Sequence, residues 1–302
     1  MKSPIIDQAI EVIFRELKGI IAGNDYSEYS AKRNEIDKVT QTTFRIFNGE
    51  KLSRLVLEQY TINSKAYGVV LTIYPMPEFG IPVFIFQLGG QIPDRVIFVL
   101  DIMPVINSEA ISAVSVIYNK YASEMKNLGT TQDWMNQVAS KNALVCQYKP
   151  IDPEDIIESL TDYLQVWRDK FYLPAQSNST GADEKTAVES ILRFKKILKA
   201  NDAGLDIYLK KFGKPMLDAL ENASFGAYPS LETDEAKDNI PPTIEEIPAP
   251  GNAQIQWTDE ALKYLEEAPK FVRSKIRANA EKKAMEMGVN LITPEFIENL
   301  RK

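Results

Sequence analysis

The sequence predicts an α/β protein in which an antiparallel sheet is flanked by helices, an α/β/α sandwich, followed by a small C-terminal all-helical module. Three observations predict this architecture. Alternating apolar residues recur in five closely spaced runs between about residues 40 and 104, helical periodicity precedes and follows these runs, and an acidic, proline-rich stretch separates the last segment. We therefore expect a large domain at 1–227, a linker at 228–256 and the module at 257–302.

The first elements are a helix and a strand meander. Apolar residues at helical spacing predict a helix over 4–22. The period then changes to two, and the Asn48-Gly49 pair marks a hairpin turn. Short turns between successive strands predict an antiparallel meander. The five strands are expected in TQTTFRIFN, LSRLVLEQYTI, YGVVLTIYP, IPVFIFQLG and RVIFVLDIMP.

Helices are expected to complete the large domain. Asp152 suits an N-cap and Pro153 the first helical position, which predicts a helix start there. The composition of QSNSTGADEK, at 176–185, predicts a flexible loop. The expected helices span 108–127, 130–142, 153–173, 186–200 and 204–223.

The module after the linker carries its own helix signals. Thr258 suits an N-cap, Pro269 opens a second helix, and Gly288 ends that helix as a C′ residue. Thr293, followed by proline, predicts a third helix start. The segment therefore has the signals of an independent helical unit.

Two residue types are nearly absent, and this limits the chemistry. The chain has no histidine, which excludes Ser-His-Asp and Cys-His catalysis and histidine-based metal sites. Its single cysteine, Cys146, excludes disulfides, cysteine-based zinc sites and an intrinsic iron–sulfur cluster. No Gly-x-Gly-x-x-Gly fingerprint for a flavin or nicotinamide is present. We therefore expect no covalently bound cofactor, and acid–base chemistry would depend on carboxylates, lysine or tyrosine.

Charge and hydropathy constrain the partners. The net charge of −7 argues against nucleic-acid binding and disfavours, without excluding, an acidic electron carrier. No apolar run reaches membrane-spanning length, and the N-terminus is typical of an amphipathic helix rather than a signal peptide. These features predict a soluble intracellular protein with no transmembrane segment.

A spaced set of residues marks the last segment: Trp257, Thr258, Ala261, Leu265, Pro269, Phe271, Val272, Arg273, Arg277, Glu281, Ala284, Gly288 and Thr293. In these residues and their spacing the segment resembles the C-terminal domain of the B subunit of light-independent protochlorophyllide reductase. The resemblance implies a role in enclosing a chlorophyll precursor, with Trp257, Phe271, Arg273 and Arg277 contacting a pigment or a partner. Alternatively, the arginines are surface charges, with Arg277 and Glu281 forming an i,i+4 pair. Without cluster cysteines, the reductase activity does not transfer.

Three segments between residues 40 and 225 carry a second pattern. They are LVLEQY at 55–60, YPMPEFGIPVFIFQLGG at 74–90 with the later VLDIMP, and KANDAGLDIYLKKFG at 199–213. In these segments the chain resembles the ferredoxin-dependent bilin reductases. The resemblance implies an antiparallel sheet between helices, with a tetrapyrrole held between the sheet and the C-terminal helices. It also implies an external ferredoxin as electron donor.

The same resemblance identifies a ligand site and two departures from the family. Glu58, Val70, Gln87, Asn201 and Asp202 occupy the ligand-binding positions. Gln87 replaces the family's proton-donating aspartate, and Val70 replaces the histidine found in some members. A neutral amide can hydrogen-bond a pyrrole but cannot act as a proton donor. Glu58 and Asp202 remain as acid groups that could serve catalysis.

Structural roles compete with these assignments. Glu58 could point outward from its strand, and the pair Asn201 and Asp202 could cap the following helix. Asp101, at a strand end, is expected to be structural. The aromatic residues expected in the core rather than against a pigment are Phe79, Phe84 and Phe86.

Three functions fit these observations. The first is a protein that binds a bilin or chlorophyll-type tetrapyrrole without reducing it, acting in pigment handling or in assembly with photosynthetic complex subunits. The second is a ferredoxin-dependent tetrapyrrole reductase that uses Glu58 and Asp202. The third is a ligand-free scaffold in which the linker tethers the module to a partner. The resemblances imply the cytoplasm or the plastid stroma, including the periphery of thylakoid membranes.

Overall fold

A seven-stranded antiparallel sheet forms the centre of the large domain, with the strands in sequence order. The structure is a computed structural model that describes residues 3–21, 26–35, 38–91, 95–106, 111–123, 125, 134–177, 181–201, 203–226, 256–266, 277, 280–281, 283–284 and 291–299. The strands are β1 Tyr26–Glu35, β2 Lys38–Gly49, β3 Leu52–Ile62, β4 Ala66–Pro75, β5 Val83–Gln91, β6 Arg95–Met103 and β7 Leu144–Lys149. This confirms the predicted meander.

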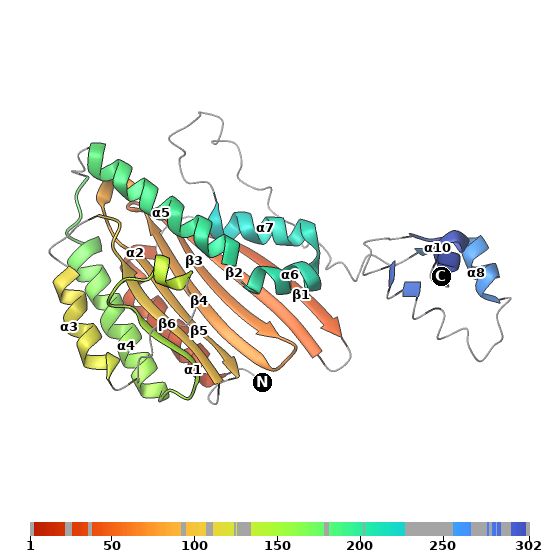
Figure 1. The fold of residues 1–302 in the computed structure, drawn as a ribbon, viewed down its shortest axis with the longest axis horizontal. Helices are drawn as coiled ribbons and strands as arrows, with labels where there is room; N and C mark the ends of the chain where they lie inside the picture. Colours follow the sequence, from red (N-terminus) through yellow and green to blue (C-terminus); the bar gives the residue numbers. More distant parts are fainter. Residues whose placement is uncertain are drawn as a thin grey trace.

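Helices cover both faces of the sheet (Figure 1). The first face carries α1 Pro4–Glu16, α2 Lys18–Ile21, α3 Ile111–Ala122, α4 Pro153–Val166 and a π-helical turn, η3, at Trp167–Tyr172. The second face carries α5 Gly181–Asn201, α6 Ala203–Phe212 and α7 Lys214–Phe225. Short 3-10 turns lie at η1 Pro77–Phe79 and η2 Met135–Gln137. The α/β/α arrangement predicted from the alternating periods is confirmed.

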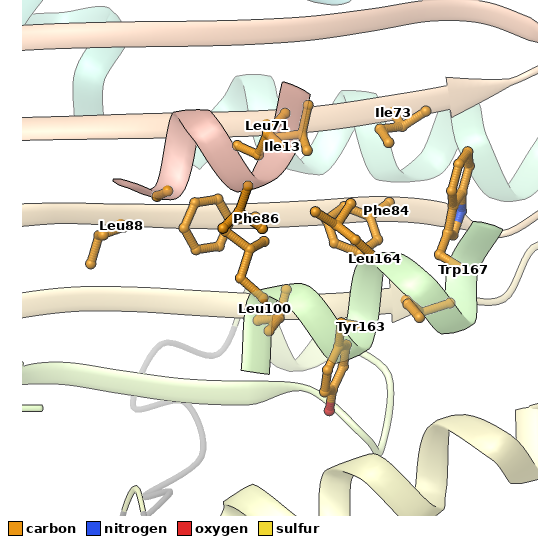
Figure 2. Packing of buried hydrophobic residues seen from close by; sticks show 14 of the residues in the cluster. Ile13, Leu71, Ile73, Phe84, Phe86, Leu88, Leu100, Tyr163, Leu164 and Trp167 are labelled. Atoms are coloured by element: carbon orange, nitrogen blue, oxygen red, sulfur yellow. The ribbon is translucent and has the colours of Figure 1, made fainter. Parts of the chain in front are cut away.

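Strand alternation separates two cores. Leu71, Phe84 and Phe86 point to the first face, where they pack with Ile13 of α1 and Leu164 of α4 (Figure 2). On the second face, residues one position away along the strands pack against α5, α6 and α7. The strand residues of this second cluster include Phe44, Val56, Tyr74, Val83 and Met103. Because both faces are covered, the central strands are apolar along most of their length.

The structure differs from the prediction at four segments. β1 and β7 were not predicted, because β1 is a polar edge strand and β7 is short. The expected helix at 130–142 is wrong, since its described part contains only η2 and then non-helical residues. The loop predicted at 176–185 is wrong from Gly181 onward, where α5 begins. The predicted helix starts at Asp152 and Pro153 are confirmed, and the Asp152 side chain accepts from the Glu154 amide at 2.9 Å.

The C-terminal module has a small core of its own and is not purely helical. α8 Asp259–Glu266 and α10 Pro294–Asn299 accompany a parallel strand pair, β8 Gln256–Trp257 and β9 Leu291–Ile292. The pair is only two residues long on each side, which is too short to produce an alternating pattern in the sequence. Gln256, the last residue of the predicted linker, pairs with Leu291 of β9, and residues 227–255 lie outside the described residues. The core residues are Ala261, Ala280, Ala284, Ile292 and Ile297.

The predicted caps of this module are confirmed. The Thr258 hydroxyl accepts from the Ala261 amide at 3.1 Å, and the Thr293 hydroxyl accepts from the Phe296 amide at 3.3 Å. The predicted ends of the middle helix, Pro269 and Gly288, lie outside the described residues. In the described part of the chain, no helix combines the length and apolar character that a membrane crossing requires.

Two cations hold the last turn of α7. Lys195 Nζ donates to the carbonyls of Phe225, at 2.7 Å, and Gly226, at 3.3 Å. Arg54 Nη1 donates to the carbonyl of Asn222 at 2.8 Å. Cations suit a helix C-terminus, where carbonyl groups lack helical partners. Burial, together with repulsion from Arg54, lowers the pKa of Lys195 to about 7.

The titration of Lys195 predicts a pH dependence of stability. Its pKa is about 7 in the folded state and about 10.4 in an unfolded chain. Between these values the unfolded chain binds the extra proton, so the free energy of unfolding rises with pH. Between pH 7 and 9 we expect the wild type to gain about 2 kcal/mol relative to Lys195→Met, measured by urea unfolding at each pH. Lys196→Met, on the exposed side of α5, is the control. Equal pH profiles for wild type and Lys195→Met would contradict this assignment.

Candidate functional site

Three of the predicted site residues lie in one row across the sheet. Glu58 of β3 is directly opposite Val70 of β4, and Val70 is opposite Gln87 of β5. Residues directly opposite in antiparallel strands point to the same face. The face is the second one, covered by the C-terminal helices, because Val56 is two residues from Glu58 on the same strand and packs there. The structure thus brings together side chains that are up to 29 positions apart in sequence (87 − 58).

Glu58 is held by two hydroxyl groups. Thr42 Oγ1 on β2 donates to Glu58 Oε1 at 3.0 Å, and the Tyr208 hydroxyl on α6 donates to the same oxygen. The side chain therefore points toward α6 rather than outward into solvent. Burial and the negative charge of Glu58 raise the pKa of Tyr208 well above its usual value, so the phenol stays protonated as a donor. The carboxylate is thus oriented between the sheet and α6.

Val70 and Gln87 lie between two covered parts of this face. On one side, Tyr208 covers the region of Glu58 and is 5% exposed. On the other side, Val99, opposite Gln87, is buried against Met135 of η2. Val70 and Gln87 themselves are only half-buried. A ligand that reaches Val70 and Gln87 would contact the apolar side chain of the first and the neutral amide of the second. The amide can donate and accept hydrogen bonds but does not titrate.

The remaining predicted residues of this site stand apart from the row. Asn201 is the last residue of α5 and is exposed, and its side-chain amide donates to the Ile197 carbonyl of its own helix at 2.8 Å. Its contact is thus local to the helix end. Asp202 lies outside the described residues. Its proposed role as an acid group remains a prediction.

Asp101 and two of the phenylalanines have structural positions. The buried Asp101 carboxylate accepts from the Ser140 amide at 2.8 Å and from the Ser140 hydroxyl at 2.5 Å. Burial raises the pKa of Asp101 to about 6, and the bonds from Ser140 oppose this rise. Phe84 and Phe86 are buried in the first core, on the other face of the sheet from the Glu58 row. Phe79 is half-buried and packs at the edge of the same core.

The C-terminal module contains a second group of predicted residues. Trp257 Nε1 donates to Glu281 Oε1 at 3.1 Å, and Arg277 Nε donates to the same oxygen at 2.9 Å. The Arg277 guanidinium lies 5.8 Å from the centre of the Trp257 ring. These three side chains therefore bind one another within the module. The other two predicted contact residues, Phe271 and Arg273, lie outside the described residues.

Comparisons with known proteins give one match for most of the chain and one for its C-terminal module. Among solved structures, the chain is similar to phytochromobilin synthase from tomato in complex with biliverdin, with a TM-score of 0.59 and 15% sequence identity over 74% of this chain and 82% of that chain. The large domain has the bilin-reductase fold. Residues 257–301 match the family model described as the proto-chlorophyllide reductase 57 kD subunit. Comparison with curated protein sequences finds no match.

Sequence reasoning missed two tyrosines of the bilin-reductase-like domain. Tyr208 binds Glu58, and Tyr60 lies two residues beyond Glu58 on the same side of β3. The period of two in LVLEQY was sufficient to place Tyr60 on the face of Glu58. The glycines Gly68 and Gly89, within strands, were a further signal of a close approach over the sheet. No sequence signal paired Tyr208 with Glu58, because 150 positions separate them. Among the described residues, no group of three or more His, Cys, Asp or Glu side chains is placed to hold a metal ion.

Proposed function

We propose that this protein binds a tetrapyrrole on the sheet face beneath α5–α7 and acts in pigment handling or in assembly of a photosynthetic complex, without bilin reductase activity. The observation that carries the proposal is the cross-strand row of Glu58, Val70 and Gln87. The row lies on a fold shared with a biliverdin-bound protein. The match of the C-terminal module to a protochlorophyllide reductase subunit supports the same ligand class independently.

The chemistry of the row favours binding over reduction. Reduction of a pyrrole by single electrons requires a proton donor near the substrate, and Gln87 and Val70 supply none. The one acid group of the row, Glu58, already accepts hydrogen bonds from Thr42 and Tyr208. A carboxyl group and a neutral amide instead suit a pyrrole N–H or a ring carbonyl, which they can hold by hydrogen bonds.

The first test is a spectroscopic titration of the full chain. We expect biliverdin, protochlorophyllide or chlorophyllide to shift its absorbance band on binding, and Val70→Trp to abolish the shift by filling the space over β4. Val116→Trp is the matched control, because Val116 lies on α3 at the other face and is 72% exposed. No shift with any of the three pigments would overturn the proposal.

The same titration separates binding from catalysis. Reduced ferredoxin is added to the pigment complex, and the proposal expects the band to persist. Bleaching that is lost in Glu58→Gln would establish the enzyme alternative, with Glu58 as an acid group. If the Glu58→Gln variant still bleaches, Glu58 is not the proton donor and Asp202 is the remaining candidate acid group.

A further inference from the structure

Two glycines lie inside the central strands of the sheet at positions where the backbone conformation does not require glycine. Gly68 of β4 and Gly89 of β5 are directly opposite each other. Neither has a positive φ, unlike Gly90 on the same strand. Glycine in a strand interior weakens the strand and often marks a close approach by another group.

The ring of Tyr60 occupies the space above both glycines. Tyr60 is opposite Gly68, so its side chain leaves β3 on the same face. A Cβ atom at Gly68 would lie 2.2 Å from Tyr60 Cζ, and a Cβ atom at Gly89 would lie 2.1 Å from the Tyr60 hydroxyl. The ring thus lies across β4 and its hydroxyl reaches β5. Any larger residue at either position would force the ring away from the sheet.

This ring is adjacent to the Glu58 row. Tyr60, Gly68 and Gly89 each lie two residues from Glu58, Val70 and Gln87 on the same three strands. Two residues along a strand span about 6.6 Å, so the ring lies beside the row on the same face. The Tyr60 side chain is half-buried. Within the described residues, Tyr60 belongs to neither of the two core clusters that flank the sheet.

We propose that Tyr60, seated on Gly68 and Gly89, is a stacking surface for the planar conjugated rings of the ligand and determines which tetrapyrroles fit. This inference rests on the proposed function and assigns a specificity role to a residue outside the Glu58 row. A flat aromatic ring offers an extended π-surface that an aliphatic residue cannot supply. An aliphatic side chain at position 60 would also fill the sheet surface without requiring two strand glycines. Contact with Gly68 and Gly89 sets how far the Tyr60 ring lies from the sheet and how it is tilted. These two quantities determine how much space a ligand has above the ring.

The test compares variants of the ring and of its seat in the pigment titration. We expect Tyr60→Leu to weaken pigment binding roughly 3- to 10-fold and to shift the bound absorbance band, because stacking is lost. Gly68→Ala displaces the intact ring and is expected to cause a loss of the same order. Tyr60→Phe keeps the ring and should retain both affinity and band. Tyr67→Leu is the matched control, since Tyr67 lies on the adjacent strand but packs against the first core.

The outcomes are distinguishable from failure of the proposed function. If the wild type binds no pigment, the proposed function itself fails. If the wild type binds, and Tyr60→Leu and Gly68→Ala retain its affinity and band, the stacking role is overturned while the binding function stands. Circular dichroism and thermal unfolding confirm that each variant is folded. In a folded Gly68→Ala protein the Tyr60 ring must have moved. Normal pigment binding by that variant would contradict the claim that the position of the ring on the two glycines determines binding.

Discussion

Replacing Gln87 with aspartate is expected to create ferredoxin-dependent tetrapyrrole reduction at a rate about 100-fold or more above the background measured with the wild type. General acid catalysis by a positioned side chain contributes about 10²- to 10⁴-fold. Gln87 lies opposite Val70 in the Glu58 row, at the position of the family's proton donor in the sequence resemblance. Aspartate there would be half-buried, and partial burial raises the pKa of a carboxyl group toward the range in which it can donate a proton. The measurement is single-turnover bleaching of bound biliverdin by reduced ferredoxin.

The control for this gain of activity is Gln91→Asp. Gln91 is at the exposed end of the same strand, so the substitution adds the same charge away from the row. It should leave the rate unchanged. A Gln87→Asp protein that binds pigment as tightly as the wild type but shows no faster bleaching would refute the assignment of Gln87 to the proton-donor position.

Replacing Trp167 with alanine is expected to lower the free energy of unfolding by about 4 kcal/mol. Trp167 is fully buried, and its Nε1 donates to the Pro82 carbonyl at 2.8 Å. Its ring stacks on Tyr172, with the ring centres 5.5 Å apart. It also meets Phe84 edge-on, with the ring centres 6.2 Å apart, and Figure 2 shows Trp167 beside Phe84. The substitution therefore creates a cavity and leaves a buried carbonyl without its donor.

Urea unfolding measures this loss, and Trp134→Ala is the control. Trp134 is half-buried beside the small cluster around Met135, so we expect its removal to cost less than half as much. Trp167→Phe should fall between wild type and Trp167→Ala, because it keeps the ring and loses the hydrogen bond. Equal losses for the alanine variants at 134 and 167 would show that the first core does not depend on Trp167.

The π-helical turn explains the Trp167 stack. In η3, residues five apart lie one turn above each other, so Trp167 and Tyr172 face the same side with an interplanar angle of 28°. In an α-helix the same pair would point about 140° apart. Lys51 Nζ donates to the Tyr172 carbonyl at 3.1 Å and to the Ala175 carbonyl at 2.7 Å, and thereby holds the end of the turn.

Local patterns along the chain were enough to predict the layers, most strand positions and the helix caps of the C-terminal module. The period of two in LVLEQY and IPVFIFQLG predicted which residues share a face of the sheet. The threonines at the start of helical segments predicted the helix N-caps at Thr258 and Thr293. These features are local, since they depend on residues within a few positions of one another. The same reasoning missed β1 and β7, whose pairing depends on a neighbouring strand more than on their own pattern.

The contacts of the candidate site depend on packing between segments that are far apart in the sequence. Tyr208 meets Glu58 because α6 packs over the second face, and the seat of Tyr60 exists because three strands align in one register. Tyr172 stacks on Trp167 because η3 widens into a π-turn. The physical reason is the same in each case. Packing between distant segments sets the distance and orientation of side chains, whereas sequence periodicity specifies only the face to which each one points.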